Sequence, residues 1–518
     1  MLDLGTSLIA SVTRDPGALA IVDGPTRLSY GAWYRQVSAL VAALDRLGLR
    51  HGDRLLTLLQ NRWEAATLHW ACQLTGVILT PLNWRATADD VAYCLRDAEI
   101  RAVIFEDVSA AAVRAAEGAP AVPRITLGTA LPGELAFAEL QDASAPDATP
   151  RAGAEDWSLM LYTSGTTSRP KGVPRRHRAE RAAAIAHVAQ NLYRRGERTL
   201  GVMPLYHTMG VRSLLAMALL NGAFICLPRF DVATALALIE AERITNLYLV
   251  PTLYHDMLAH PRFAQTDISS VRKLGFAGAS MTDGLLKRLQ EAFKPELFVN
   301  HYGSSEVYTC AIDQDAPRKP GSAGRAGLNQ NLRVVKLGAL SPDETAAPGE
   351  EGEIAALLAG DEAFEGYWRR PDADAKALRQ GWYMTGDTGF FDAEGDLFVT
   401  GRVDDMIITG GENVSPVEVE SCLSLHPAVA EVAVVGLPDE RWGKVVTAFI
   451  RCAAPVDSAE LDRHCRESGL ANFKRPRAFV LVETLPRSPV GKLLRRKLTE
   501  GDYTPAGAPN PAAKEPTA

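Results

Sequence analysis

Apolar segments a few residues long alternate with segments of helical period over most of the chain. Residues 54–60 and 101–105 have the length and composition of buried strands, and residues 63–75 and 89–97 carry apolar side chains every three to four positions. The same two patterns recur at three later places, with strand-like residues 199–203, 246–250 and 273–277 before helix-like residues 212–220, 253–259 and 283–293. This alternation predicts an α/β fold in which crossover helices connect parallel strands.

The pattern changes from about residue 352 onward. Short strand-like pieces there are separated by Gly and Asp turns, which predicts a β-rich subdomain at the end of a large domain. A strand-like piece at 397–400 leads into the short polar segment 401–405, which has the composition of a linker. We therefore expect an N-terminal domain over residues 1–401 and a hinge over residues 402–405.

The segment after the hinge has the length of a small domain. Its pattern predicts a helix at 416–425, strands at 429–436 and 445–451, and a second helix at 458–468. We expect a small α+β C-terminal domain over residues 406–501. The tail at 502–518 is rich in Pro and Ala, and we expect it to be disordered.

The composition is that of an ordinary globular enzyme. Of the 518 residues, 47% are hydrophobic and 23% are charged, and 55 Lys and Arg against 62 Asp and Glu give a formal charge of −7. Because the charge is slightly negative and no long block of one sign occurs, we expect no nucleic-acid partner. The sequence leaves a monomer and a homodimer as alternatives, since dimers are the commonest protein oligomers.

Neither the cysteines nor the apolar segments indicate secretion or membrane insertion. The seven cysteines are scattered without a CxxC pair, which suits a reducing compartment better than a disulfide framework or a zinc site. The first residues are interrupted by Asp, Arg, Pro and Gly, and the longest apolar stretch, 213–228, is interrupted by Asn221 and Gly222. We expect a cytoplasmic protein, with attachment to a membrane surface as the minor alternative.

One loop stands out for its chemistry. Residues 162–172, YTSGTTSRPKG, follow the apolar residues 157–161 and combine five Ser and Thr hydroxyls, two glycines and a lysine. Such a loop can surround a polyphosphate with hydroxyl, backbone N–H and ammonium donors. It does not match the common P-loop pattern GxxxxGK[ST], and taken alone it fits a solvated turn equally well.

Five motifs in order carry a resemblance to a known superfamily. They are residues 162–172, 302–306 (YGSSE), 383–387 (YMTGD), 401–405 (GRVDD) and 486–492 (PRSPVGK). In this series the chain resembles the adenylate-forming, or AMP-binding, superfamily of acyl-CoA synthetases, from near the N-terminus to about Lys497. Residues 203–207 (MPLYH), 410–413 (GGEN), 441–443 (RWG) and 472–477 (NFKRPR) make it most similar to benzoate- and halobenzoate-type aryl-CoA ligases, with furoate-CoA ligases as a further candidate.

The resemblance implies a two-step activation of a carboxylic acid. The carboxylate attacks the α-phosphorus of ATP to give an acyl adenylate and pyrophosphate, and a thiol then displaces AMP to form a thioester. Bringing an anionic carboxylate to a triphosphate requires cationic and hydrogen-bonding compensation, for which the family uses Mg²⁺ and a lysine. ATP, Mg²⁺, coenzyme A and a small carboxylic acid are the implied ligands.

The resemblance also assigns residues to the nucleotide. The β and γ phosphates are expected at Thr163, Ser164, Gly165, Thr166, Thr167 and Lys171. Tyr302 and Ser305 belong to the same nucleotide site, and Glu306 is the expected Mg²⁺ ligand, with a surface acid on a loop as the alternative reading. Asp387 is expected to accept hydrogen bonds from both ribose hydroxyls, and Arg402 to assist at the ribose or phosphates unless it is an ordinary linker cation.

Three further residues are assigned to catalysis. Lys492 is the expected adenylation catalyst, because its single mobile ammonium can bridge the carboxylate and the α-phosphate. His207 resembles the ring that gates the acid near its carboxylate, with a histidine satisfied in the core as the alternative. Asp404 resembles the hinge residue about which the C-terminal domain swings between the two half-reactions.

Coenzyme A is the expected thiol. By resemblance, the pantetheine passes Gly410 and Gly411, where the missing side chains allow a close approach. The nucleotide of CoA is expected to be bound by Trp442, Phe473, Arg475 and Arg477, since aromatic rings and arginines suit a phosphorylated purine. The segment of about twenty residues after Lys497 is too short for a carrier domain, which also favours CoA.

The acyl pocket is placed by resemblance as well. Its expected residues are Ile185, His207, Met209, Tyr248, Ala277, His301, Gly303, Tyr308 and Thr309. Their bulk favours a short, flat pocket, and the polar groups of His301, Tyr308 and Thr309 favour a ring heteroatom or a ring hydroxyl. Furoate, benzoate and substituted benzoates all remain candidate acids.

Two departures and two alternatives complete the expectation. Ser168 replaces the usual glycine of the phosphate loop, and Ser305 replaces the usual threonine before Glu306. One alternative is a catalytically silent relative that binds a nucleotide or an acid, against which Lys171, Glu306, Asp387 and Lys492 together argue. The other is an adenylating enzyme that transfers its acyl group to a free-standing carrier protein, against which the residues expected at CoA argue.

Overall fold

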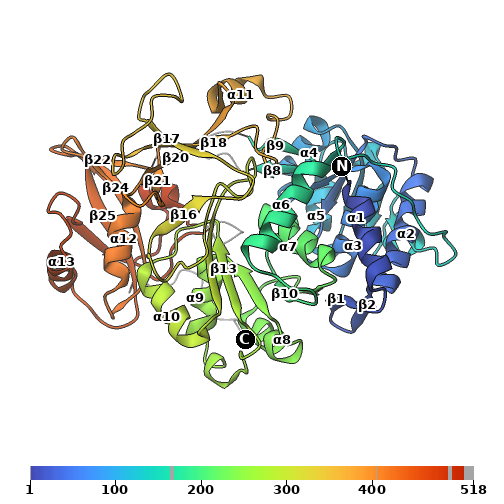
Figure 1. Ribbon diagram of the computed structural model, residues 1–518, viewed down its shortest axis with the longest axis horizontal. Helices are drawn as coiled ribbons and strands as arrows, with labels where there is room; N and C mark the ends of the chain where they lie inside the picture. The colour runs from blue at the N-terminus through green and yellow to red at the C-terminus, as the bar shows by residue number, and fades with distance from the viewer. Residues whose placement is uncertain (1, 164–168, 404, 488–492, 507–518) are drawn as a thin grey trace, which may run out of the picture.

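The computed structural model describes residues 2–163, 169–403, 405–487 and 493–506. Figure 1 shows two neighbouring α/β regions, a β-rich region beside them, and a C-terminal unit at the end of the molecule far from the N-terminal helices. The expected α/β class, with a large N-terminal domain and a small C-terminal domain, is confirmed.

The first region is a seven-stranded sheet. Its spatial order is β7-β6-β5-β3-β4-β8-β9, and all neighbours are parallel except β8 and β9. Its strands are β3 (Arg54–Leu58), β4 (Ile78–Pro81), β5 (Ile100–Phe105), β6 (Arg124–Thr126), β7 (Leu135–Ala136), β8 (Trp157–Thr163) and β9 (Lys171–Arg176). The helices of this part are α1 (Leu4–Arg14), α2 (Tyr30–Arg46), α3 (Trp63–Thr75), α4 (Ala88–Asp97) and α5 (Asp107–Ala115).

The second sheet has fourteen strands and joins a parallel half to an antiparallel half. The parallel half comprises β1 (Leu19–Asp23), β11 (Ala223–Cys226), β10 (Arg198–Gly201), β12 (Asn246–Leu249), β13 (Lys273–Ala277) and β14 (Leu297–Tyr302), with β2 (Thr26–Ser29) antiparallel at its edge. Its helices are α6 (His177–Gln190), α7 (Thr208–Leu219), α8 (Val232–Ala241), α9 (Pro251–Ala259) and α10 (Asp283–Phe293). The antiparallel half comprises β15 (Ala311–Asp313), β16 (Ser322–Ala326), β17 (Leu332–Lys336), β18 (Gly352–Leu357), β19 (Leu378–Arg379), β20 (Trp382–Phe391) and β21 (Leu397–Arg402), with α11 (Pro371–Ala377) beside it.

Two helices begin earlier than their apolar pattern predicts. Helix α7 begins at Thr208 instead of residue 212, because the His207 side chain caps it by accepting a hydrogen bond from the Met209 N–H at 3.4 Å. Helix α9 begins at Pro251 instead of residue 253, since proline suits the first position of a helix. In both cases a residue at the start of the helix, and not the apolar period, sets where the helix begins.

The C-terminal unit has hydrophobic clusters of its own, built only from residues between Ile407 and Tyr503. Its elements are β22 (Ile407–Thr409), β23 (Glu412–Val414), α12 (Pro416–Ser424), β24 (Val429–Asp439), β25 (Gly443–Cys452), α13 (Ser458–Glu467), β26 (Ala478–Leu481) and α14 (Arg495–Thr499). The unit contacts the large domain where α12 meets α10, with the Gly284 N–H donating to Ser424 Oγ at 3.4 Å.

The expectation of disorder from residue 502 is wrong for residues 502–506. The Tyr503 ring packs edge-on against Phe449 with 4.9 Å between ring centroids. The Glu483 N–H donates to the Thr504 carbonyl, and the Ala506 N–H donates to the Leu481 carbonyl. These contacts supply the enthalpy that orders the segment, despite its composition.

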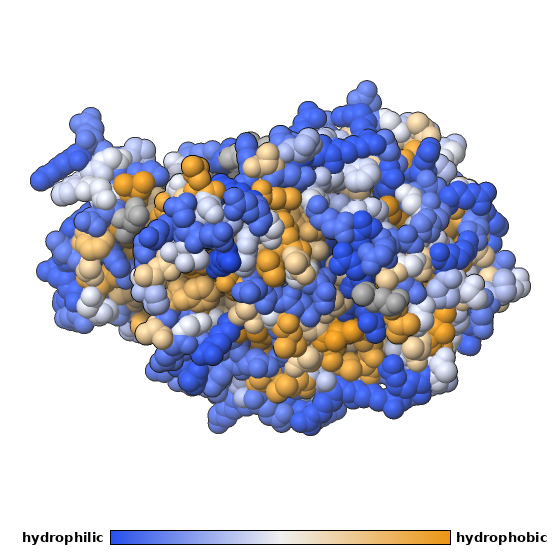
Figure 2. All heavy atoms as spheres, turned by 45° about the horizontal axis from the view of Figure 1, so that its top comes forward, coloured by the Kyte–Doolittle hydropathy of each residue, from blue (hydrophilic) through white to orange (hydrophobic). Residues whose placement is uncertain are grey.

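Most of the face shown in Figure 2 is hydrophilic, and hydrophobic residues gather toward its middle. Among the described residues, no helix has both the length and the apolar character needed to cross a membrane.

Candidate active site

The loop of residues 162–172 is held at both ends by a pair of strands. Strand β8 ends at Thr163 and β9 begins at Lys171, and these two residues are partners in the antiparallel register. The Thr163 hydroxyl donates to the Lys171 carbonyl at 3.5 Å. Ser164, Gly165, Thr166 and Thr167 lie outside the described residues, so their expected phosphate contacts stay predictions.

Lys171 and Glu306 contact the same tyrosine. The Lys171 ammonium lies 3.9 Å from the centre of the Tyr367 ring, and the Tyr367 hydroxyl donates to Glu306 Oε1 at 2.7 Å. Burial lowers the pKa of Lys171, while the Glu306 carboxylate acts in the opposite direction. Tyr367 therefore contacts a cation with its ring and an anion with its hydroxyl, and the two charged residues come from separate segments.

Glu306 is oriented by a tight turn of its own segment. The Ser304 hydroxyl accepts hydrogen bonds from the N–H groups of Glu306 and Val307, both at 3.2 Å. The buried Arg175 donates to the Glu306 carbonyl at 3.0 Å. Glu306 is 6% exposed, and a carboxylate oxygen held this firmly is a suitable ligand for the Mg²⁺ expected there. No described contact defines a role for Ser305.

Asp387 lies between Tyr302 and Arg402. The Tyr302 hydroxyl donates to Asp387 Oδ2 at 2.7 Å, and Arg402 lies 3.6 Å from Oδ1. Electrostatic contacts link this group to the one around Tyr367, because Tyr383 interacts with Tyr367, Glu306 and Asp387. We call these linked residues the nucleotide cluster: Lys171, Tyr302, Glu306, Tyr367, Tyr383, Asp387 and Arg402.

Several of the residues expected around the acid lie close together. The ring centroids of Tyr248 and His301 are 4.9 Å apart, and Tyr248 is also 4.8 Å from His187. Arg212 of α7 donates to the Thr309 hydroxyl at 2.6 Å and to the Tyr308 carbonyl at 3.2 Å. A second Arg212 nitrogen donates to the Tyr248 hydroxyl.

Neither Arg212 nor His187 is among the residues expected from the sequence. Arg212 follows His207 by five positions inside an apolar helix pattern, where its charge is the one signal that could have identified it. His187 lies on α6, three residues before Gln190, the last residue of the helix. We call the set of His187, Arg212, Tyr248, His301 and Thr309 the acyl cluster.

The remaining residues expected at the acid differ in their surroundings. Met209 is buried on α7 and Ala277 is buried at the end of β13. A Cβ atom on Gly303 would lie 2.1 Å from the Tyr308 carbonyl oxygen, so this position requires glycine. Ile185 is 42% exposed, and no described contact joins it to the acyl cluster.

The residues expected at CoA form two groups on the C-terminal unit. The Gly410 N–H donates to the Trp442 carbonyl at 2.9 Å, and a Cβ atom on Gly410 would lie 2.8 Å from the Trp442 ring. Gly410 and Gly411 have φ values of +58° and +86°, which glycine adopts without strain. Trp442 is 46% exposed, and the Arg441 guanidinium lies 4.8 Å from the centre of its ring.

The second group surrounds Asn472. Arg475 and Arg477 both donate to the Asn472 side chain, and Arg475 lies 3.3 Å from Asp462. The Phe473 ring is exposed beside them. No described contact joins this group to Trp442. Lys492 and Asp404 lie outside the described residues, and their roles stay predictions.

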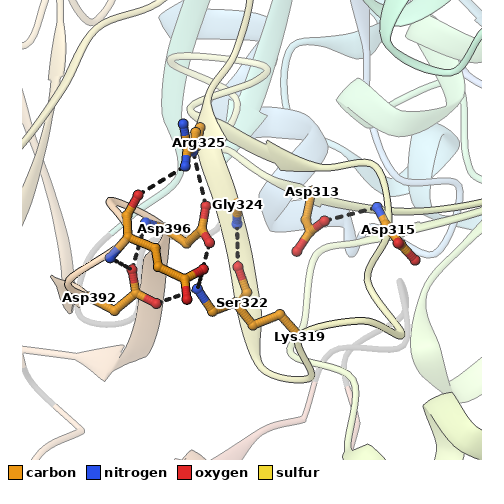
Figure 3. Close-up of polar contacts among 9 residues, drawn as sticks. Asp313, Asp315, Lys319, Ser322, Gly324, Arg325, Asp392 and Asp396 are labelled. Atoms are coloured by element: carbon orange, nitrogen blue, oxygen red, sulfur yellow. Dashed lines mark hydrogen bonds and ion pairs between the residues drawn. The ribbon is translucent and has the colours of Figure 1, made fainter.

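An acidic cluster elsewhere has the spacing of a metal site but is already neutralised. Asp392, Glu394 and Asp396 place their carboxylate oxygens within 4.8 Å of one another. The Lys319 ammonium lies among them at 2.5, 2.9 and 2.6 Å, and Arg325 contacts Asp396 at 3.1 Å (Figure 3). A lysine ammonium thus occupies the place that a cation would take.

Comparison with known families matches both parts of the chain. The family model described as AMP-binding enzyme matches residues 8–368, and the model described as AMP-binding enzyme C-terminal domain matches residues 418–492. These two matches cover the nucleotide cluster except Tyr383, Asp387 and Arg402, and all of the acyl cluster.

Individual relatives are similar over nearly their whole length. A 4-chlorobenzoate–CoA ligase of Arthrobacter sp is 35% identical, with 97% of this chain and 96% of the relative covered. An indoleacetate–CoA ligase of Aromatoleum aromaticum is also 35% identical, with 92% of this chain and 94% of the relative covered. The crystal structure of an anthranilate CoA ligase in complex with anthranoyl-AMP superimposes with a TM-score of 0.89 at 26% identity, with 96% and 97% covered.

Proposed function

Because the chain belongs to the family of AMP-binding enzymes and is an AMP-forming acyl-CoA synthetase, we propose that it joins a small aromatic or heteroaromatic carboxylic acid to coenzyme A. Furoate, benzoate and substituted benzoates are the proposed acids. The proposal rests on one observation above the others: the buried rings of Tyr248 and His301 lie together at the place expected for the acid.

The nucleotide cluster supplies what adenylation needs from the protein. Lys171 offers an ammonium to phosphate oxygens, and Asp387 offers carboxylate oxygens to the ribose hydroxyls. Glu306, oriented by Ser304 and Tyr367, would hold the Mg²⁺. When bound there, Mg²⁺ neutralises the charge that builds up on the departing pyrophosphate.

The proposed reaction proceeds in two balanced steps. In the first, a carboxylate oxygen of the acid bonds to the α-phosphorus of ATP as the bond to pyrophosphate breaks, and Lys492 bridges the two anions. In the second, the CoA sulfur, after losing its proton, bonds to the acyl carbon as AMP leaves with the electron pair. Trp442 and the Asn472 group are proposed to hold the CoA nucleotide during the second step.

The ring acid is supported by both the acyl cluster and the relatives. The described residues of the cluster are aromatic rings and polar groups, which favour a flat acid over a long flexible chain. The printed names of the relatives include 4-chlorobenzoate, indoleacetate and anthranilate, although one relative at 32% identity is named a long-chain-fatty-acid–CoA ligase. Fatty acids are therefore the necessary comparison in any substrate test.

The test is product detection by mass with ATP, Mg²⁺, CoA and one acid at a time. The panel contains furoate, benzoate, hydroxy- and halobenzoates, and fatty acids of short, medium and long chain. The proposal predicts AMP and a CoA thioester from ring acids and much less from fatty acids. Equal or better turnover of fatty acids would refute the proposed acid class, and an acyl adenylate without a CoA thioester would favour a carrier protein as the acceptor.

A further inference from the structure

The acyl cluster contains a buried cation without a partner of opposite charge in contact with it. Arg212 is 2% exposed, and its described hydrogen bonds go to the Tyr248 hydroxyl, the Thr309 hydroxyl and the Tyr308 carbonyl, which are all neutral. Among the described residues, no carboxylate forms an ion pair with Arg212. Its Nε–H, also buried, has no hydrogen-bond partner.

A nearby buried arginine, in contrast, is paired with a carboxylate. Arg175 is fully buried, and its Nε lies 2.8 Å from Glu180, which is fully buried as well. The Tyr308 ring lies against both arginines, 4.0 Å from Arg175 and 6.0 Å from Arg212. Buried charges in proteins are normally paired. The buried Glu362 carboxylate is near enough for the Arg212 charge to act on its pKa, but its described hydrogen bonds come from Thr309 and Asn329, so it leaves the Arg212 Nε–H unused.

Two buried histidines next to Arg212 also have unused ring nitrogens. The Asn191 side-chain amide donates to His187 Nδ1 at 3.0 Å, and the Asn191 oxygen faces His301 Nε2 at 3.2 Å. This pattern places the proton of His187 on Nε2 and the proton of His301 on Nε2. The remaining groups, the His187 Nε2–H donor and the His301 Nδ1 acceptor, are buried without a partner.

Both histidines are neutral at ordinary pH. Burial lowers their pKa well below the usual value, and the Arg212 charge lowers the pKa of each further. The two rings lie 5.2 Å apart and both lie within 5 Å of the Tyr248 ring, whose hydroxyl contacts Arg212. The cluster thus offers two unused donors and one unused acceptor around a single tyrosine.

The position along α7 separates these groups from the reacting end of the acid. His207, expected beside the carboxylate, caps α7, and Arg212 follows five residues later. At the helical rise of about 1.5 Å per residue, this places Arg212 about 7.5 Å further along the helix axis than His207.

From these contacts we infer that Arg212, with His187 and His301, selects ring acids that carry a hydrogen-bonding oxygen remote from the reacting carboxylate. A ring hydroxyl fits the cluster best, because its oxygen accepts from Arg212 or His187 and its proton is donated to His301 Nδ1. This inference rests on the proposed function and narrows its acid class. A bare or methyl-substituted ring would leave the buried polar atoms unpaired, which is unfavourable.

The experiment compares hydroxybenzoates with the methylbenzoates substituted at the same ring position. A methyl group has nearly the size of a hydroxyl but forms no hydrogen bond, so the ratio of the two kcat/KM values isolates the polar contact. For at least one ring position, the wild-type ratio is expected to favour the hydroxy acid by about tenfold or more.

Four variants assign the effect to the cluster. Arg212→Met should bring that ratio close to one, and Arg212→Lys should keep part of it because the charge remains while the planar donor fork is lost. Ser213→Ala is the matched control on α7, since the described hydrogen bond of its hydroxyl goes to the Met209 carbonyl, and its ratio should equal that of the wild type. If Arg212→Met does not fold, as judged by thermal unfolding, His187→Phe carries the test and should also lower the ratio.

The outcomes separate the two proposals. A wild-type ratio near one at every ring position, or a ratio unchanged in Arg212→Met and His187→Phe, overturns the inference while AMP release from ring acids upholds the proposed function. If no ring acid supports AMP release, the proposed function fails and the inference fails with it.

Discussion

The nucleotide cluster and the acyl cluster differ in how their charged side chains are paired. In the nucleotide cluster, Asp387 faces Arg402, and Tyr367 joins Lys171 to Glu306, so that opposite charges are matched before any ligand arrives. In the acyl cluster, every described hydrogen bond of Arg212 goes to a neutral group, and the buried Glu362 carboxylate acts on it with no ion pair among the described contacts. We expect the nucleotide cluster, whose charges are paired, to act equally on every acid. We expect the acyl cluster to favour an acid whose ring oxygen forms hydrogen bonds with its unused polar atoms.

Lys492→Ala is expected to have the largest effect of these variants. Loss of the ammonium that bridges carboxylate and α-phosphate should abolish acyl-adenylate formation with every acid, while thioester formation from supplied acyl adenylate and CoA should persist. The two half-reactions are measured separately by pyrophosphate release and by thioester mass. Equal loss of both would remove the assigned role.

Glu306→Gln tests whether the nucleotide cluster is indifferent to the acid. Removing the carboxylate that would hold Mg²⁺ should lower the rate of AMP release on the order of 10²-fold or more, because metal stabilisation of developing charge is worth several kcal/mol. The factor should be the same for hydroxy and methyl acids. Glu291→Gln, at an exposed position of α10, is the matched control, and a factor that depends on the acid would contradict the comparison.

Tyr367→Phe removes the hydrogen bond to Glu306 and keeps the ring against Lys171. Because the lost bond is to a carboxylate, Glu306 should be less well oriented, and the Mg²⁺ concentration for half-maximal activity should rise about tenfold. Activity should recover at high Mg²⁺. Tyr367→Leu, which also removes the ring against Lys171, should in addition raise the KM for ATP. A Mg²⁺ titration that matches the wild type would show that Tyr367 does not position Glu306.

Trp442→Ala should act on neither cluster. Loss of the half-exposed ring should raise the KM for CoA about tenfold, since stacking on a base contributes about 1 to 3 kcal/mol. Acid-dependent exchange of pyrophosphate into ATP, which needs no CoA, should stay at the wild-type rate. Loss of that exchange would show that Trp442 acts in adenylation and not only in thioester formation.

The two histidines of the acyl cluster should make the free energy of unfolding depend on pH. The pKa values of His187 and His301 are lowered on folding, so the unfolded chain binds more protons than the folded protein below about pH 6.5. The free energy of unfolding should therefore fall as the pH drops through 6.5 and not depend on these groups above it. The expected slope is at most about 1.4 kcal/mol per pH unit for each histidine.

Urea unfolding between pH 5 and pH 8 measures this dependence. His187→Phe should flatten the acid side of the curve while keeping a ring of similar size in place. An identical acid slope in the variant would show that His187 is protonated in the folded protein or exposed to solvent.

The sequence predicted the fold, and it named part of each cluster, without Tyr367 and Tyr383 in the nucleotide cluster and without His187 and Arg212 in the acyl cluster. Strand β13 and helices α3 and α10 lie where their apolar patterns place them. Helix α10 buries one face, whereas α3 and β13 are buried at nearly every residue. Glu306 and Asp387 could be named because each lies within a short motif. Tyr367 and Arg212 could not, since their roles arise from contacts between segments distant in the chain, such as Tyr367 with Glu306.

The central claim is that this enzyme activates ring acids as adenylates and passes them to CoA. The most direct measurement is exchange of labelled pyrophosphate into ATP, with Mg²⁺ and one ring acid and without CoA, followed by addition of CoA. Exchange is expected only when the acid is present, followed by release of AMP and a thioester of the expected mass. Absence of exchange with every ring acid, or exchange without a CoA thioester, would contradict it.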